Sequence, residues 1–219
     1  MTGYNKKTSV LVLTGVIGLI AAVLVGWGEF LLNFDDLGRY SEVNYDFMKG
    51  TDDSDFSRGH FIGVLAAPLY LVGCWHIYLM LKPAHQKWAM AAFLIAAYGF
   101  IVGAVWIGSR ASIGTLANML DTTQVKMLIE FYQFRYETLL TVIRITTLVL
   151  SLIFIGLVLT GKSYYPRWVA IFNPIILIIG SFIVFAAFPE IGKYLLPIAL
   201  NVAFFIFFII SIKQAHKVQ

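Results

Sequence analysis

Residues 8–32 read TSVLVLTGVIGLIAAVLVGWGEFLL, an apolar stretch with a single charged residue, Glu29. A helix needs about 20 apolar residues to cross the ~30 Å hydrocarbon core of a bilayer. The stretch also exceeds the ~7–15 apolar residues of a secretory signal peptide, and no small-residue cleavage site closes it. We therefore predict a retained transmembrane helix at the start of the chain.

Five further apolar runs of similar length follow, at about residues 60–81, 88–107, 139–160, 168–188 and 194–212. Within a bilayer a helix satisfies its own backbone hydrogen bonds, so each run is expected to be helical. The chain is 59% hydrophobic and 13% charged, and no Pro-, Ser- or Gly-rich linker divides it. The sequence thus predicts one all-α polytopic membrane domain over residues 1–219, with six transmembrane helices.

Charges of opposite sign fall on opposite sides of these spans. One side carries Lys6, Lys7, Lys82, Lys87, Lys162, Arg167, Lys213 and Lys217. The other side carries Asp35, Asp36, Glu42, Asp46, Asp52, Asp53, Asp55, Asp121 and Glu190. By the positive-inside rule both termini are expected in the cytoplasm. The net charge of +4 then reflects topology, and no nucleic-acid partner is expected.

Two outer segments depart from plain spans. The loop at residues 33–57 is long, acidic and aromatic, which fits either a lid over the outer face or simple disorder. The fourth helix is expected to run from Thr123 to Gly161, because no Pro or Gly interrupts it before its last turns. Its first part, residues 125–138, would project outward. Arg144 would then lie about one turn inside the hydrocarbon.

Helical spacing places small or charged residues on single faces. The faces are Gly15, Gly18, Ala22, Gly26 and Glu29; His60, Gly63, Ala67 and Cys74; Ala92, Ala96, Gly99, Gly103, Trp106 and Arg110; and Glu130, Gln133, Glu137, Thr141 and Arg144. Small residues mark helix–helix interfaces in membranes. We therefore expect these faces to converge on a polar chamber at the outer side.

Charged side chains in hydrocarbon cost at least ~2.5–3.5 kcal/mol, so such residues indicate function. We assign proton transfer to Glu29, His60 and Glu137, since carboxylates and a histidine suit acid–base work. Ligand binding is assigned to Arg110, Glu130, Arg144 and Asn201, the arginines for a phosphate or carboxylate head group. Asn201 and Pro197, like Asn173-Pro174, fit either a broken-helix binding site or an amide that satisfies a carbonyl freed by proline.

Other interpretations of these residues stay open. Glu29, Glu130 and Glu137 would also suit a buried ion network with the arginines. A metal site built from Glu29, His60 and a carboxylate of the fourth helix is chemically reasonable, although its spacing matches no known signature and no cofactor is identified. His76 is interpreted as an interfacial histidine, and Cys74 as an inert packing thiol.

Three functions are compatible with such a chamber. It would bind, and in one version modify by acid–base chemistry, a lipophilic or lipid-like small molecule that enters from membrane lipids. The alternatives are a substrate-capture or ion-coupled transport protein, and a non-catalytic scaffold or channel. Arg135 lies off the charged face, at a solvated or subunit-contact position, which leaves a homo-oligomer open.

The motifs Gly26-Trp27-Gly28-Glu29, Gly59-His60 and Phe172-Asn173-Pro174 lie in three different spans. With residues 160–168 (TGKSYYPRW) and Pro197 to Asn201, they give the chain a pattern that resembles a group of uncharacterised bacterial six-span integral membrane proteins. This resemblance implies a bacterial inner (cytoplasmic) membrane. It implies no activity and assigns no functional residue.

Overall fold

The computed structural model describes residues 2–40, 45–119 and 122–218, and all regular elements in these ranges are helical. The α-helices are α1 (Thr2–Asn33), α2 (Asp53–Ala66), α3 (Leu69–Leu81), α4 (Gln86–Ala117), α5 (Thr123–Leu159), α6 (Pro174–Ala187), α7 (Pro189–Leu195) and α8 (Ala199–Ala215). Short 3-10 helices are η1 (Asp46–Met48), η2 (Arg167–Phe172) and η3 (Leu196–Ile198). The all-α prediction is confirmed.

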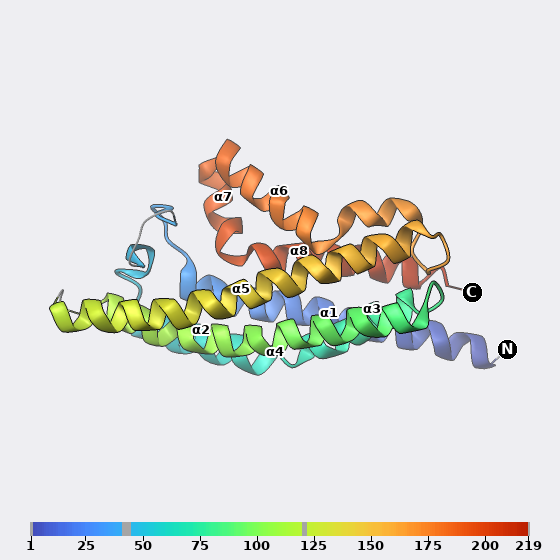
Figure 1. The fold of residues 1–219 in the computed structure, drawn as a ribbon, viewed down its shortest axis with the longest axis horizontal. Coiled ribbons are helices and arrows are strands. Elements are labelled where there is room, and N and C mark those ends of the chain that lie inside the picture. The colour runs from blue at the N-terminus through green and yellow to red at the C-terminus, as the bar shows by residue number, and fades with distance from the viewer. Residues whose placement is uncertain (1, 41–44, 120–121, 219) are drawn as a thin grey trace.

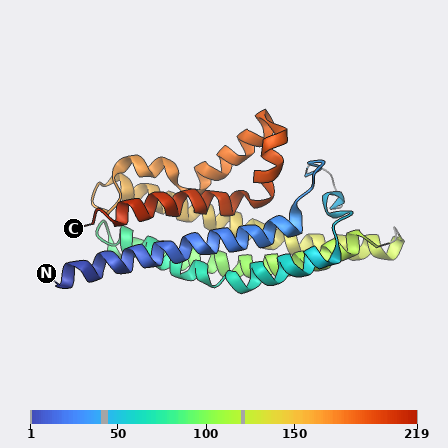
Figure 2. The ribbon, with the colours of Figure 1, turned by 180° about the vertical axis from the view of Figure 1, so that it is seen from behind.

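The long helices lie side by side, and α1 begins at the same end of the bundle at which α8 ends (Figure 1). Seen from behind, α1 runs along α8, with which it is in contact (Figure 2). Among the described residues five helical segments are long and apolar enough to cross a membrane: Lys7–Asn33, Asp53–Leu81, Gln86–Ala117, Thr123–Leu159 and Pro189–Ala215. The apolar helix α6 is shorter. This composition is that of a membrane protein.

The fifth and sixth predicted spans are broken rather than continuous. Before α6, Asn173 has an extended backbone (φ −71°, ψ 156°), and its side chain accepts hydrogen bonds from the N–H groups of Ile175 and Ile176. Proline disfavours a helical conformation in the residue before it, and it fits the first position of a helix. The expectation of one helix over residues 168–188 was therefore wrong.

The sixth run is interrupted less sharply, by η3 at Pro197 between α7 and α8, and the segment Pro189–Ala215 stays helical. In Figure 1, α6 and α7 form a hairpin that leans away from the other helices. A milder break lies between α2 and α3 at Pro68, so the second span is two helical pieces. Both breaks in the last third of the chain fall at Asn173-Pro174 and Pro197. For these residues the sequence left open either a broken helix or a helix in which an amide satisfies the carbonyl freed by proline.

Glycines allow close helix packing, and of those described below Gly18 and Gly63 lie in the predicted stripes of small residues. A Cβ atom on Gly18 or Gly73 would lie 2.6 Å from the ring of Phe208, which is fully buried. A Cβ on Gly28 would lie 2.6 Å from the backbone nitrogen of Gly63. Because any side chain at these positions would collide with rigid groups, glycine is what allows α1, α3 and α8 to meet.

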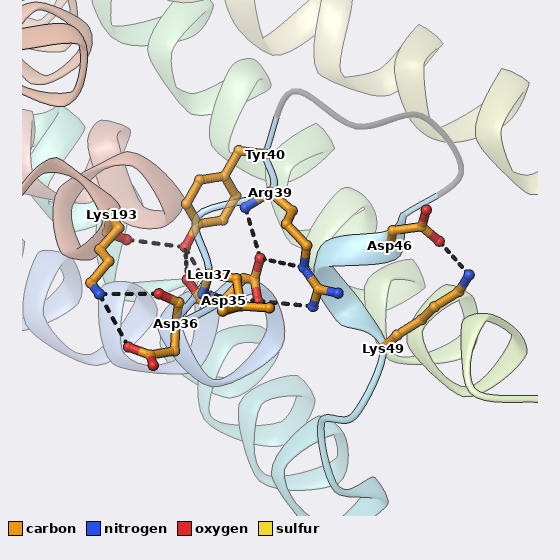
Figure 3. A network of polar contacts seen from close by, with 8 residues as sticks. All are labelled: Asp35, Asp36, Leu37, Arg39, Tyr40, Asp46, Lys49 and Lys193. Atoms are coloured by element: carbon orange, nitrogen blue, oxygen red, sulfur yellow. Dashed lines mark hydrogen bonds and ion pairs between the residues drawn. The ribbon is translucent and has the colours of Figure 1, made fainter. Parts of the chain in front are cut away.

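The described parts of the loop between α1 and α2 form polar contacts within the loop and with α7. Asp35 forms an ion pair with Arg39 at 2.9 Å, and the Tyr40 hydroxyl donates to the carbonyl oxygen of Lys193 at 3.0 Å (Figure 3). The Lys193 ammonium also contacts Asp36 at 3.2 Å. Residues 41–44, which include Glu42, lie outside the described residues, as does Asp121. The described loop segments therefore pack against the α6–α7 hairpin.

Helix α5 begins at Thr123, as predicted, with the Thr122 side chain as its N-terminal cap. The far ends of α4 and α5 extend beyond the α6–α7 hairpin (Figure 1). The expected projection of residues 125–138 beyond the membrane stays a prediction. The projecting part carries exposed apolar side chains such as Phe131 and Phe134.

Candidate functional site

Glu29 lies near the end of α1 and is buried, with 6% of its surface exposed. Its carboxylate accepts a hydrogen bond from the side-chain amide of Asn201 on α8, whose amide oxygen in turn accepts from the Tyr70 hydroxyl at 2.7 Å. Gly26 permits this approach, because a Cβ there would lie 3.0 Å from that of Asn201. Two sequence-predicted residues, Glu29 and Asn201, thus form one polar chain to which Tyr70 contributes the far end.

Arg110 lies near the end of α4 and is 4% exposed. Its Nε and Nη2 atoms both donate to the side-chain oxygen of Asn33, with 2.7 Å for Nε. Four aromatic rings surround the guanidinium carbon at 4.3–5.6 Å, namely those of Tyr45, Phe47, Trp106 and Tyr136. A cation over an aromatic face gains about 0.5–2 kcal/mol, so these rings stabilise a charge that burial would otherwise penalise.

Two cavities adjoin these residues, and together we call them the chamber. The inner cavity, of about 110 Å³, is almost wholly apolar, with Tyr70, Phe100, Gly103 and Phe204 in its wall. The outer cavity, of about 360 Å³, opens under the loop. Glu29, Trp106 and Thr147 line both cavities. The buried carboxylate therefore lies where an almost wholly apolar space meets a larger one that also carries charged side chains.

The structure brings most of the predicted site residues to the chamber. Arg110, Glu137 and Arg144 line the outer cavity with Glu29, and Asn201 lines the inner one. Glu137 and Arg144 approach to 4.0 Å, with side chains 47% and 66% exposed. Exposed ion pairs contribute little to stability, so this pair leaves both side chains free to rearrange. Within the described part of the chain, Glu29 and Arg110 form no ion pair closer than 4 Å.

Two predicted residues lie elsewhere. His60, on α2, faces Gly108 of α4 and packs against Phe61, and its Nδ1 atom is buried without a hydrogen-bond partner among the described residues. It lines neither cavity, because α2 packs against α1 and α4 on the far side of the chamber. Glu130 is exposed and lines a separate groove with Asp46 and Lys49, about two helical turns beyond Glu137.

The interpretation of His76 as an interfacial residue was wrong. His76 is fully buried, with Nε2 2.6 Å from the Ser211 hydroxyl and Nδ1 3.2 Å from that of Thr14. Ser211 also contacts the Tyr165 hydroxyl at 2.6 Å. We call these four residues the closed network. Cys74, next to this region on α3, is buried as expected for a packing thiol.

Several chamber residues were not identified as site residues from the sequence. Tyr70, Tyr136 and Asn33 carry no spacing signal, although the aromatic content of the loop pointed to Tyr45 and Phe47. Among the described residues no three His, Cys, Asp or Glu side chains are grouped as metal ligands.

The fold and chamber together define a helical membrane protein with a polar site inside its bundle. The chain matches the family of unknown function DUF6796 over residues 4–217, and it belongs to that family. Neither a curated protein nor a solved structure matches it. The resemblance to an uncharacterised family is confirmed, and the function must be argued from the chamber itself.

Proposed function

We propose that this protein binds a lipophilic or lipid-like small molecule in the chamber. The position of Glu29 carries the proposal, since this buried carboxylate lies at the junction of an apolar cavity and a larger one that carries charged side chains. Ligand sites are typically apolar clefts with a few placed polar groups. The apolar part of a ligand would enter the inner cavity, and its polar part would stay beside Glu29 and Arg110.

We further propose six membrane crossings with both termini in the cytoplasm of a bacterial cell, so that the chamber opens at the outer face of the inner membrane. The charge asymmetry of the loops supports this orientation. The broken last third of the chain would provide the fifth and sixth crossings. The loop between α1 and α2, tied to α7 through Lys193, would act as a lid over the outer cavity.

Acid–base chemistry on the bound molecule is a second proposal for the same site. Glu29 and Glu137 both line the outer cavity, and a carboxylate near a bound head group is suited to proton transfer. Neutralising Glu29 as Glu29→Gln would then abolish product formation while ligand binding persists. If no turnover of any bound amphiphile is detectable with the unaltered protein, the site only binds.

Filling the inner cavity tests the binding proposal. A Cβ on Gly103 would have its nearest contact, Ile143, at 4.0 Å, so Gly103→Phe places a ring in the cavity without a backbone clash. Gly156→Phe is the matched control, because Gly156 faces open space on α5. Equilibrium binding of radiolabelled palmitate in detergent would be measured for both variants and the unaltered protein.

We expect Gly103→Phe to weaken palmitate binding by about 10-fold or more, since a loss of ~1.4 kcal/mol of apolar contact suffices for that factor. Gly156→Phe is expected to bind like the unaltered protein. Equal binding by all three proteins would mean that the inner cavity holds no ligand, and the proposal would fail.

A further inference from the structure

Two buried polar atoms of the chamber have no hydrogen-bond partner among the described residues, the Tyr45 hydroxyl and the Trp106 indole nitrogen. Both side chains line the outer cavity, and both rings flank Arg110. Tyr45 is 6% exposed as a whole residue. A buried polar group without a partner is energetically costly and uncommon, so two of them beside one cavity are a marked departure from ordinary packing.

The Trp106 indole, the Arg110 guanidinium and the Tyr45 hydroxyl can all donate hydrogen bonds. An indole nitrogen is a donor only, and a guanidinium has five N–H groups and no acceptor. Both observed hydrogen bonds of Arg110 go to the same oxygen of Asn33. Burial raises the pKa of Tyr45 to about 12, so its hydroxyl keeps its proton at neutral pH. The wall of the outer cavity therefore carries donors at Tyr45 and Trp106 that no described acceptor satisfies, although the carboxylates of Glu29 and Glu137 also line it.

Tyr45 also has an unusual backbone conformation. Its φ of +59° makes it the non-glycine residue with positive φ in the described part of the chain. The left-handed region is unfavourable for an L-residue with a side chain, and such strain tends to occur at ligand clamps. The strained backbone holds the ring of Tyr45 edge-on to Tyr136 and beside Arg110. The loop thus positions this hydroxyl at the cavity at an energetic cost.

We infer, on the basis of the proposed function, that the chamber selects an amphiphile with an anionic head group, a carboxylate or a phosphate. The head group would accept hydrogen bonds from Arg110, Trp106 and Tyr45, while the apolar chain extends past Glu29 toward Gly103. Arginine presents paired donors that match both kinds of oxyanion.

The acidic residues of the chamber are compatible with this assignment. Glu29 already accepts a hydrogen bond from Asn201, while Arg110 donates to the Asn33 oxygen. Arg144 is two-thirds exposed and only loosely paired with Glu137, so it is free to turn toward a head group as a second cation. A cationic head group would instead meet both arginines and find no acceptor at Trp106.

The test compares four amphiphiles that share one chain length: palmitate, hexadecyl phosphate, hexadecanol and hexadecylamine. Each is titrated against the full-length protein in neutral detergent, in competition with radiolabelled palmitate. We expect either anion to bind about 10-fold or more tightly than hexadecanol, in line with the strength of charge-assisted hydrogen bonds. The ratio of palmitate to hexadecyl phosphate affinities then shows which oxyanion is preferred.

Two conservative variants report on the donors. Trp106→Phe and Tyr45→Phe remove the unpartnered N–H and O–H groups and are expected to weaken anion binding about 3- to 10-fold while hexadecanol binding stays constant. Trp27→Phe and Tyr98→Phe are the matched controls, since both side chains are more than half exposed. Thermal unfolding confirms that each variant is folded. If Trp106→Phe does not fold, Tyr45→Phe alone still tests the head-group assignment.

The outcomes separate the two proposals. If hexadecanol or hexadecylamine binds as tightly as the anions, or if both donor variants keep full selectivity, the head-group assignment is overturned and the binding proposal stands. If Gly103→Phe binds all four amphiphiles as tightly as the unaltered protein does, the binding proposal fails and the head-group assignment fails with it.

Discussion

At the end of the bundle that holds both termini, His76, Ser211 and Tyr165 satisfy one another's hydrogen bonds. At the opposite end, Tyr45 and Trp106 have buried polar atoms without a partner among the described residues. The first group lies among tightly packed glycines and Phe208, and the second lies beside two cavities. Buried polar groups that are fully hydrogen-bonded specify a structure, while those left unpartnered call for another explanation. We attribute the closed network to stability and the chamber to ligand binding.

The largest effect is expected from packing at the closed end. Gly18→Leu would drive a side chain into the Phe208 ring, whose atoms lie 2.6 Å from the added Cβ. Because Phe208 is fully buried and cannot move aside, we expect a loss of about 3 kcal/mol or more in the free energy of unfolding. Thermal unfolding in detergent measures it, with Gly156→Leu as the control. Equal unfolding temperatures for the two variants would show that the ends do not differ in packing.

Removing the histidine of the closed network should have the next largest effect. His76→Ala leaves a cavity and deprives Ser211 of one partner, so we expect destabilisation by about 2–4 kcal/mol. Palmitate affinity of the folded variant should stay unchanged, since His76 is remote from both cavities. A variant that unfolds normally but loses palmitate binding would move the functional site to the closed network.

The same substitution, Tyr to Phe, should change the free energy of unfolding differently at the two ends of the bundle. Tyr165→Phe removes a hydroxyl that contacts Ser211 at 2.6 Å, and we expect a loss of about 1 kcal/mol in the free energy of unfolding. Tyr45→Phe removes a buried hydroxyl without a partner among the described residues, so stability should be unchanged or rise by up to about 1 kcal/mol. Urea or thermal unfolding of the pair gives the comparison. A larger loss for Tyr45→Phe would mean that its hydroxyl is satisfied in the free protein.

The smallest effect is expected for Asp35 in the loop between α1 and α2, whose contribution to stability should depend on pH. Burial raises the pKa of Asp35, but hydrogen bonds from Arg39 outweigh it and hold the pKa below its usual value of 3.8. A lowered pKa contributes stability above the usual value, and this stability disappears as the pH falls through the folded-state pKa. We expect Asp35→Asn to cost at most about 1 kcal/mol at pH 7, a difference that shrinks as the pH falls below ~3.8 toward the folded-state pKa. Unfolding temperatures measured from pH 3 to 7 check this, and a difference that grows toward low pH would contradict it.

The fold was largely predictable because its strongest determinant is local. A run such as residues 8–32 predicts a helix by length and hydropathy, and stripes of small residues such as Gly15, Gly18 and Gly26 predict its packed face. The breaks at Asn173 and Pro197 were harder to predict, because a proline within an apolar run is compatible with a kinked or an interrupted helix. Only the surrounding packing decides between them.

The site was predictable only in part. Residue spacing shows which face of a helix a side chain occupies, but it does not show which other helix packs against that face. Glu29, Arg110 and Glu137 reach the chamber from the predicted faces. His60 has an equally suitable phase, but α2 packs on the other side of α4. The Tyr70–Asn201–Glu29 chain depends on a contact between residues far apart in sequence, so no spacing reveals it.

Photo-crosslinking tests the central claim most directly, that the chamber end holds an amphiphile inside the bundle. A palmitate analogue with a diazirine at the end of its chain would be irradiated with the purified protein, and the modified residues would be mapped by mass spectrometry. We predict adducts on the lining of the inner cavity, at Phe100, Leu150 or Phe204, that disappear in Gly103→Phe and persist in Gly156→Phe. Adducts confined to outward-facing residues such as Leu94 and Ile145, and equal in all three proteins, would contradict the account.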